Sequence, residues 1–287
     1  MTSLPERAGR RCHTALNALH SCLYFSPDRG KELAPYGVED PTAGYLALRA
    51  APLGAVGAGA VTAAFYNFNH ALVSRFVPEI WEFASPNTVL AARLRAVDAT
   101  LRRLLGEEAV AAPEMAEAAR LALRAAEGCD RAGRPLYAAQ ADLPVPEAPH
   151  LALWHAATML REHRGDGHIA LLQHAELDPL EALVTHTSSG HGMAPTWVLA
   201  TRGHNQQDWT AARRRLVERG LLGEDGELTE RGGALRKELE AETDRLDARP
   251  YQHLGAEGTA RLTELAGGYA RTVISSGAFP PDLFGKG

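Results

Sequence analysis

The chain contains an internal repeat, and this repeat constrains its fold more than any other feature of the sequence. His155 lies 135 residues after His20 within similar runs, and Asp178 lies 138 residues after Asp40 in a second pair of similar runs. The change of offset indicates three additional residues in the second copy. Similarity at an almost fixed spacing predicts two copies of one folding unit, in the manner of repeat proteins.

Each copy has the periodicity of helices. In residues 13–25, Leu16, Leu19 and Leu23 recur at three- and four-residue steps, which is typical of an amphipathic helix. Further helical patterns occur at residues 151–163, 87–105, 114–129 and 228–246. The prolines and the glycine of residues 130–149 predict a linker between the copies. We therefore expect a mainly α fold with a first repeat at residues 1–146 and a second at residues 147–287.

The second copy contains an ordered helix-turn-helix pattern. A short helical stretch at residues 194–201 is followed by a turn at Arg202 and Gly203 and a longer helical stretch at residues 204–217. Gly220 then ends this helix, and the Asp225-Gly226 pair predicts a tight hairpin before the next long helix. This order resembles a MarR-type winged helix. The first copy keeps two helical stretches, at residues 58–64 and 69–77, while its wing is reduced to residues 80–85. The predicted fold is thus a tandem of winged-helix-like repeats with long flanking helices.

Several short motifs extend the resemblance beyond the second copy. They occupy residues 20–27, 49–54, 65–68, 133–136 and 153–168, and they read HSCLYFSP, RAAPLG, FYNF, GRPL and LWHAATMLREHRGDGH. Together they resemble the SalK-like proteins of actinobacteria, a family with tandem helix-turn-helix motifs and about this chain length. The activity of that family is largely unassigned, so the resemblance implies a fold and no reaction.

One function class that the winged-helix pattern suggests is a ligand-responsive transcriptional regulator that binds DNA. Its side chains for bases and phosphates would be Arg202, Gln206, Gln207, Arg213 and Arg214. The formal net charge of −5 disfavours this alternative, and residues 218–230 hold five acids against one arginine. Proteins that bind nucleic acids usually present a basic surface. We therefore treat DNA binding as the second hypothesis.

The leading hypothesis is a small-molecule binding protein with a pocket between the two repeats. His20 and His155 occupy equivalent positions, and imidazole titrates near neutral pH, so both are candidate general acids or bases. The candidate ligand-binding residues are Tyr24, Tyr66, Asn67, Glu162, His163, Arg164 and His168. The expected ligand is a natural product or metabolite, and whether the protein also catalyses a reaction stays open. The competing interpretation is that both histidines are structural and that residues 162–166 form a solvated helix end.

We expect no metal and no cofactor. His155, His163 and His168 are spaced by eight and five residues, whereas a shared helical face for metal ligands needs a step of four. Residues 54–59 read G-x-x-G-x-G, which is not the dinucleotide-binding pattern. No apolar run reaches membrane-spanning length, and the three cysteines show no paired spacing, so we expect a cytoplasmic protein with no membrane partner. The oligomeric state is not readable from the sequence.

Overall fold

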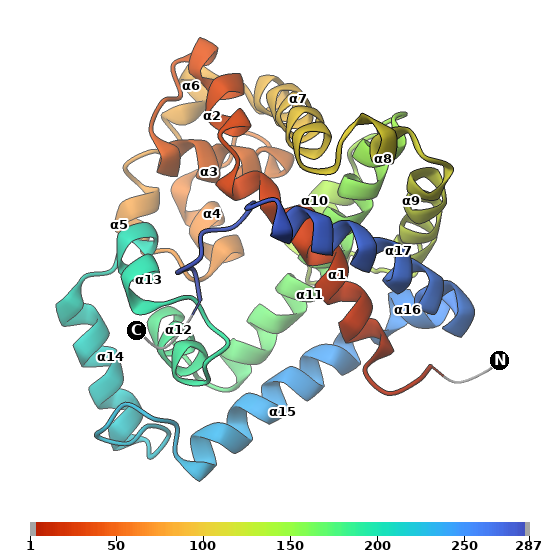
Figure 1. Ribbon diagram of the computed structural model, residues 1–287. Coiled ribbons are helices and arrows are strands. Elements are labelled where there is room, and N and C mark those ends of the chain that lie inside the picture. The colour runs from red at the N-terminus through yellow and green to blue at the C-terminus, as the bar shows by residue number, and fades with distance from the viewer. Residues whose placement is uncertain (1–3, 285–287) are drawn as a thin grey trace. The chain divides into compact units, whose positions relative to one another are not determined.

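The computed structural model describes residues 4–284 (Figure 1). The chain divides into two compact units by its contacts. Unit 1 comprises the residues up to Ala55 together with Ile80–Gly167 and Asp244–Phe279. Unit 2 comprises Val56–Glu79, His168–Thr243 and the residues from Pro280 onward. Unit 1 therefore takes residues from both predicted repeats, and the repeat boundary at residues 146 and 147 stays a prediction.

Unit 1 is built from helices that follow one another through short turns. They are α1 (Ala8–Ser21), η1 (Cys22–Phe25), α2 (Asp28–Leu33), η2 (Ala34–Tyr36), α3 (Pro41–Ala50), η3 (Ala51–Leu53), α6 (Ile80–Phe83), α7 (Pro86–Leu105), α8 (Glu107–Ala111), α9 (Pro113–Ala126), α10 (Pro135–Ala141), α11 (Pro149–His174, up to Gly167), α16 (Ala248–Leu254) and α17 (Ala256–Ser275). Asp40 caps α3 by accepting hydrogen bonds from the backbone N–H groups of Thr42 and Ala43.

Unit 2 holds the helix-turn-helix pattern. Its helices are α4 (Ala58–Phe65), α5 (His70–Val73), the end of α11, α12 (Pro179–Ser188), α13 (Pro195–Arg202), α14 (Gln206–Glu218) and α15 (Glu230–Leu246, up to Thr243). The turn between α14 and α15 is closed by a bridge between Leu222 and Leu228, and Gly226 has a φ of +86°. The predicted order of two helices, a tight turn and a long helix is confirmed. Residues 4–284 contain isolated β-bridges and no β-strand.

The long helices are where the periodicity predicts them, but three predictions were wrong. The helix predicted at residues 151–163 runs on to His174, because polar residues after position 160 are paired within their units, as His163 is with Asp247 and His168 with Thr243. The predicted linker at residues 130–149 contains α10, whose Leu136, Tyr137 and Gln140 are buried. The helix predicted at residues 69–77 is regular only in α5, and Pro78 disfavours helical geometry at the residue before it.

The core of unit 1 lies between α1, α17, α9 and α11. α1 packs along α17 (Figure 1), and their apolar faces bring Leu16 and Leu19 into one cluster with Leu262 and Val273. Trp154 of α11 is buried in the same cluster. Burying the apolar stripe of each helix is the main stabilising contribution of such a bundle.

The core of unit 2 lies under α12, α13 and α14. Trp209 and Leu216 of α14 pack with Val198 of α13 and Leu183 of α12. Asp178 begins α12 with a capping box, since its side chain accepts from the backbone while Glu181 bonds back to the Asp178 N–H. The helix-turn-helix segment is therefore fixed by its own apolar face.

In unit 2, the segment that follows α4 lies against the turn between α13 and α14. The backbone N–H of Asn69 donates to the carbonyl of Arg202 at 2.8 Å, and the Arg202 guanidinium lies 4.4 Å from the centroid of the Phe68 ring. Gly203, with a φ of +76°, faces the side chain of Leu72 so closely that an added Cβ would lie 2.5 Å from the Leu72 Cβ. These contacts join equivalent segments of the two predicted repeats.

Among the described residues, each helix taken singly is too short or too polar to span a membrane. One bent pair of segments, Pro41–Leu53 with Ala58–Phe65, has the length and apolar composition of a membrane span, and this rests on length and composition alone.

Replacing Gly203 by alanine should destabilise the protein, because the substitution strains a left-handed backbone and collides with Leu72. We expect a loss of roughly 2 kcal/mol or more in the free energy of unfolding. Gly220→Ala is the matched control, since its φ is +66° and its only neighbour within 4 Å is an Arg231 nitrogen at 3.9 Å. Chemical denaturation should show a smaller loss for the control. Equal losses would mean that the packing against Leu72 contributes nothing.

Candidate functional site

One face of α11 carries a line of polar side chains that is buried inside unit 1. His155, Thr158, Glu162 and Asp166 follow one another at steps of three or four residues, and each is less than 5% exposed. We call these four residues the polar stripe. Burying polar groups costs free energy unless partners satisfy them, so their partners define what this site does.

The centre of the polar stripe is a buried ion pair between Glu162 and Arg49 of α3. The Arg49 Nε and Nη2 atoms donate to the two carboxylate oxygens of Glu162, each at 3.2 Å. Arg161 also donates to Glu162, at 2.5 Å, and is itself partly exposed. Burial alone would raise the pKa of Glu162, but the Arg161 and Arg49 guanidinium groups hold it well below its usual range. Glu162 is therefore an anion with two cationic neighbours.

His20 of α1 meets the polar stripe at Thr158. The Thr158 hydroxyl donates its single proton to the Trp154 carbonyl, so its oxygen accepts from the His20 Nδ1–H at 2.9 Å. This leaves His20 Nε2 as a lone-pair acceptor, and it has no hydrogen-bond partner among residues 4–284. The Tyr24 ring lies edge-on to the imidazole, with centroids 5.3 Å apart. Tyr24 also packs on Tyr45, and both tyrosines are partly exposed.

His155 is held in the opposite tautomer through Gln140 of α10. Arg93 of α7 donates to the Gln140 Oε1 at 3.1 Å, and since a guanidinium can only donate, the amide nitrogen of Gln140 must face His155. That nitrogen lies 2.9 Å from His155 Nδ1, which therefore accepts and leaves the proton on Nε2. Within the described part of the chain, the His155 Nε2 and the Arg93 Nε have no partner.

Both histidines are neutral at pH 7. Burial and then the Arg161 charge lower the pKa of His20 to about 3, and burial and then Arg93 lower the pKa of His155 to about 4. General bases work best when their pKa lies near the working pH, so this environment disfavours proton transfer by either ring and favours hydrogen bonding. Burial raises the pKa of Asp166 to about 6, although the backbone N–H of Tyr137 donates to its carboxylate.

His163 and Arg164 lie on a different side of α11 from the polar stripe. The His163 Nδ1 lies 2.9 Å from Asp247 at the start of α16, and Arg164 donates to Asp244 at 2.8 Å. Arg134 donates to the backbone carbonyl of His163. His163 is fully buried. The interpretation of residues 162–166 as a solvated helix end is therefore wrong for Glu162, His163 and Asp166, which burial and pairing remove from water.

Three of the predicted ligand-binding residues belong to unit 2. The Tyr66 hydroxyl donates to the Leu177 carbonyl at 2.5 Å, and the His168 Nδ1 lies 2.8 Å from the Thr243 hydroxyl. The backbone carbonyl oxygen of Asn67 lies 3.3 Å from the His204 Nε2. Of the predicted set, the structure brings His20, Tyr24, His155 and Glu162 into the region of the polar stripe.

The predicted DNA-contacting residues are on α13 and α14. Gln206, Gln207 and Arg214 are exposed, while Arg202 lies over Phe68 and Arg213 lies over the turn at Gly226. Two further arginines, one in α14 and one directly after it, are engaged inside unit 2. Arg215 pairs with Asp178 and Glu181, and Arg219 pairs with Glu181 at 2.8 Å. The exposed residues of the following turn include Glu224, Asp225, Glu227 and Glu230.

Sequence reasoning missed Arg49, Arg93, Gln140 and Tyr45. A signal for Arg93 was present, because it follows Val89 by four residues and precedes Val97 by four, on the apolar face of α7. A charged residue at such a position is buried and needs partners. Arg49 lies in the apolar run of α3 and carries the same signal.

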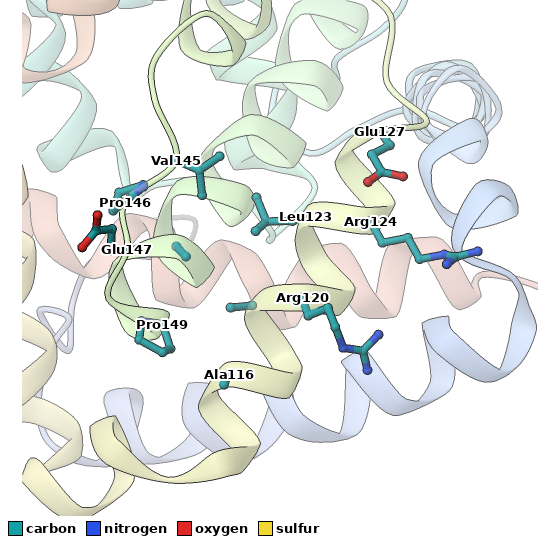
Figure 2. A pocket seen from close by; sticks show the side chains of 11 residues that line it. Ala116, Arg120, Leu123, Arg124, Glu127, Val145, Pro146, Glu147 and Pro149 are labelled. Carbon is teal, nitrogen blue, oxygen red and sulfur yellow. The ribbon is translucent and has the colours of Figure 1, made fainter.

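A surface groove of about 510 Å³ lies elsewhere in unit 1, between α9 and the segment that leads into α11. Figure 2 shows Leu123 on one side and Val145 on the other, with Arg120 and Arg124 along α9. Its lining includes none of the predicted site residues. A second hollow of about 420 Å³ lies between α8, α9 and α17.

The Arg49–Glu162 pair should be non-additive in stability. Glu162→Leu alone leaves a buried arginine with one partner fewer, so we expect a loss of about 3–5 kcal/mol in the free energy of unfolding. The double variant Glu162→Leu with Arg49→Met removes both charges and should be more stable than Glu162→Leu. Urea denaturation of the two single variants and the double variant measures the coupling. Additive losses would show that the pair is not coupled.

Comparison with known proteins identifies the family of the chain. A model described as a helix-turn-helix family matches residues 9–280. No curated protein and no solved structure matches the chain. The finer resemblances to SalK-like proteins and to the MarR-type winged helix stay predictions. With its α13–turn–α14 geometry and a match across most of its length, the chain belongs to this helix-turn-helix family.

Proposed function

We propose that the protein binds a small organic molecule at the polar stripe of unit 1. The observation that carries this proposal is the Nε2 atom of His20, a buried and unprotonated acceptor without a donor among the residues described. An unsatisfied buried acceptor costs about 1–3 kcal/mol. A ligand hydroxyl or N–H that donates to this atom would recover that free energy.

The surroundings of His20 support a binding site. The Arg49–Glu162 pair provides fixed charges, and Tyr24 and Tyr45 provide partly exposed aromatic surface next to it. Ligand sites commonly combine aromatic walls with a few fixed polar groups. Because the pKa of His20 is lowered to about 3, we propose binding and not general base catalysis.

DNA binding is the second candidate, favoured by membership of a helix-turn-helix family and by the exposed Gln206 and Gln207 at the start of α14. Two observations weigh against it. The turn before α14 contacts the segment around Asn69, and the exposed residues after α14 are acidic. DNA-binding helices of this type insert their first turn into the major groove, where acidic neighbours would be repelled by phosphates.

A thermal-shift screen with metabolites, organic acids, sugars, amines and aromatic compounds tests the binding proposal. A compound at 100 times its dissociation constant should stabilise the wild type by about 2.7 kcal/mol. His20→Asn keeps a donor for Thr158 but lacks Nε2, so the same compound should lose most of this effect. His253→Asn is the matched control, since His253 is exposed in unit 1 and contacts Glu127.

Two results of this screen would contradict the proposal. One is equal stabilisation of wild type and His20→Asn by every active compound, and the other is the absence of any active compound.

In parallel, the wild type is titrated into labelled duplex DNA from its own gene region at low and moderate salt. Binding that weakens steeply with salt and is reduced in Arg214→Gln would favour the second candidate.

A further inference from the structure

Arg93 of α7 is a buried cation without a carboxylate partner among residues 4–284. It is 5% exposed, and it contacts the Leu48 carbonyl, the Gln140 amide oxygen and the face of Trp154. Buried charges are normally paired with an opposite charge. The contact with Trp154, at 5.2 Å from the ring centroid, stabilises the cation only partly.

Carboxylates usually bind the side of an arginine guanidinium that carries Nε and Nη2, and in Arg93 this side is only partly used. Carboxylates bind arginine with two parallel hydrogen bonds from neighbouring N–H groups. Here Nη2 donates to the neutral Gln140 oxygen, and the adjacent Nε donates to nothing in the described structure. Within the described residues, the Nε–H of Arg93 is therefore free to donate one of the two hydrogen bonds that a carboxylate accepts.

His155 adds a second unused donor and is linked to Arg93 through Gln140. Gln140 contacts Arg93 with its oxygen and His155 with its nitrogen, so both residues are bound to one amide group. The His155 Nε2–H, fixed by this chain of hydrogen bonds, has no acceptor in the part of the chain that the structure describes. Two unsatisfied donors on residues that share one amide, one of them a buried cation, favour an anionic acceptor.

The net charge of the side chains in and around the polar stripe indicates the charge of that acceptor. Three arginines, Arg49, Arg93 and Arg161, stand against two carboxylates, Glu162 and Asp166, which leaves one positive charge in excess at pH 7. A single negative charge balances this excess, whereas a phosphate dianion would exceed it.

We propose that the ligand of unit 1 carries a carboxylate, which Arg93 Nε and His155 Nε2 bind. This inference rests on the proposed function and specifies its ligand class. The donors are closed to solvent, so the side chains around them must part for the ligand to enter, and association is slower than for an open site.

Isothermal titration with benzoate and its neutral analogue benzamide tests the inference on the full chain. Benzoate should bind the wild type, and benzamide should bind at least about tenfold more weakly. Arg93→Lys keeps the positive charge but loses the paired N–H groups, so its affinity for benzoate should fall by about tenfold or more. Arg124→Lys, on the exposed face of α9, is the control and should bind benzoate as the wild type does.

A second measurement does not depend on the variants folding. Benzoate added to the wild type should shift the ring ¹⁵N resonance of His155 Nε2, and inorganic phosphate should not. Equal binding of benzamide and benzoate, binding unaffected by Arg93→Lys in a folded variant, an unshifted His155 or a preference for phosphate would each overturn the inference. If only neutral compounds bind, and do so through His20, the carboxylate inference fails while the proposed function stands.

Discussion

The buried ion pair between Arg49 and Glu162 determines how the rest of unit 1 is arranged. Its two hydrogen bonds join α3 to the middle of α11, and a buried carboxylate at this position is tolerable only with such partners. Because Glu162 is fixed, the other members of the polar stripe face the same interior, where Thr158 bonds His20 and His155 bonds Gln140. The polar interior therefore follows from one charged contact.

In this interior, one imidazole nitrogen of each of two histidines is left unsatisfied by the described residues. His20 offers an acceptor and His155 offers a donor, although the two histidines were predicted to be equivalent members of a repeat. Their different tautomers follow from different neighbours, which are a threonine of α11 for His20 and a glutamine of α10 for His155. These two open groups are the basis of the ligand site that we propose. In unit 2, by contrast, the arginines of α14 mostly stabilise the helix-turn-helix segment itself.

The sequence predicted the long helices α7, α9 and α15, because apolar periodicity is a local property. The caps at Asp40 and Asp178 are equally local, since each carboxylate accepts from backbone N–H groups two and three residues on. The sequence did not predict the length of α11 or the roles of its polar residues, since the partner of Glu162 is 113 residues distant in the chain. Nothing within α11 distinguishes a solvated polar run from a buried one. Arg93 and Arg49 were also missed, although an arginine on an apolar helix face already indicates a buried charge.

The central claim is that two neutral imidazoles in opposite tautomers lie inside unit 1. Ring ¹⁵N NMR of the histidines as a function of pH tests it most directly. The structure predicts that His20 and His155 stay neutral down to pH 5, with the proton on Nδ1 in His20 and on Nε2 in His155. Titration of either ring near its usual pKa of about 6.5, or the same tautomer in both, would contradict the account.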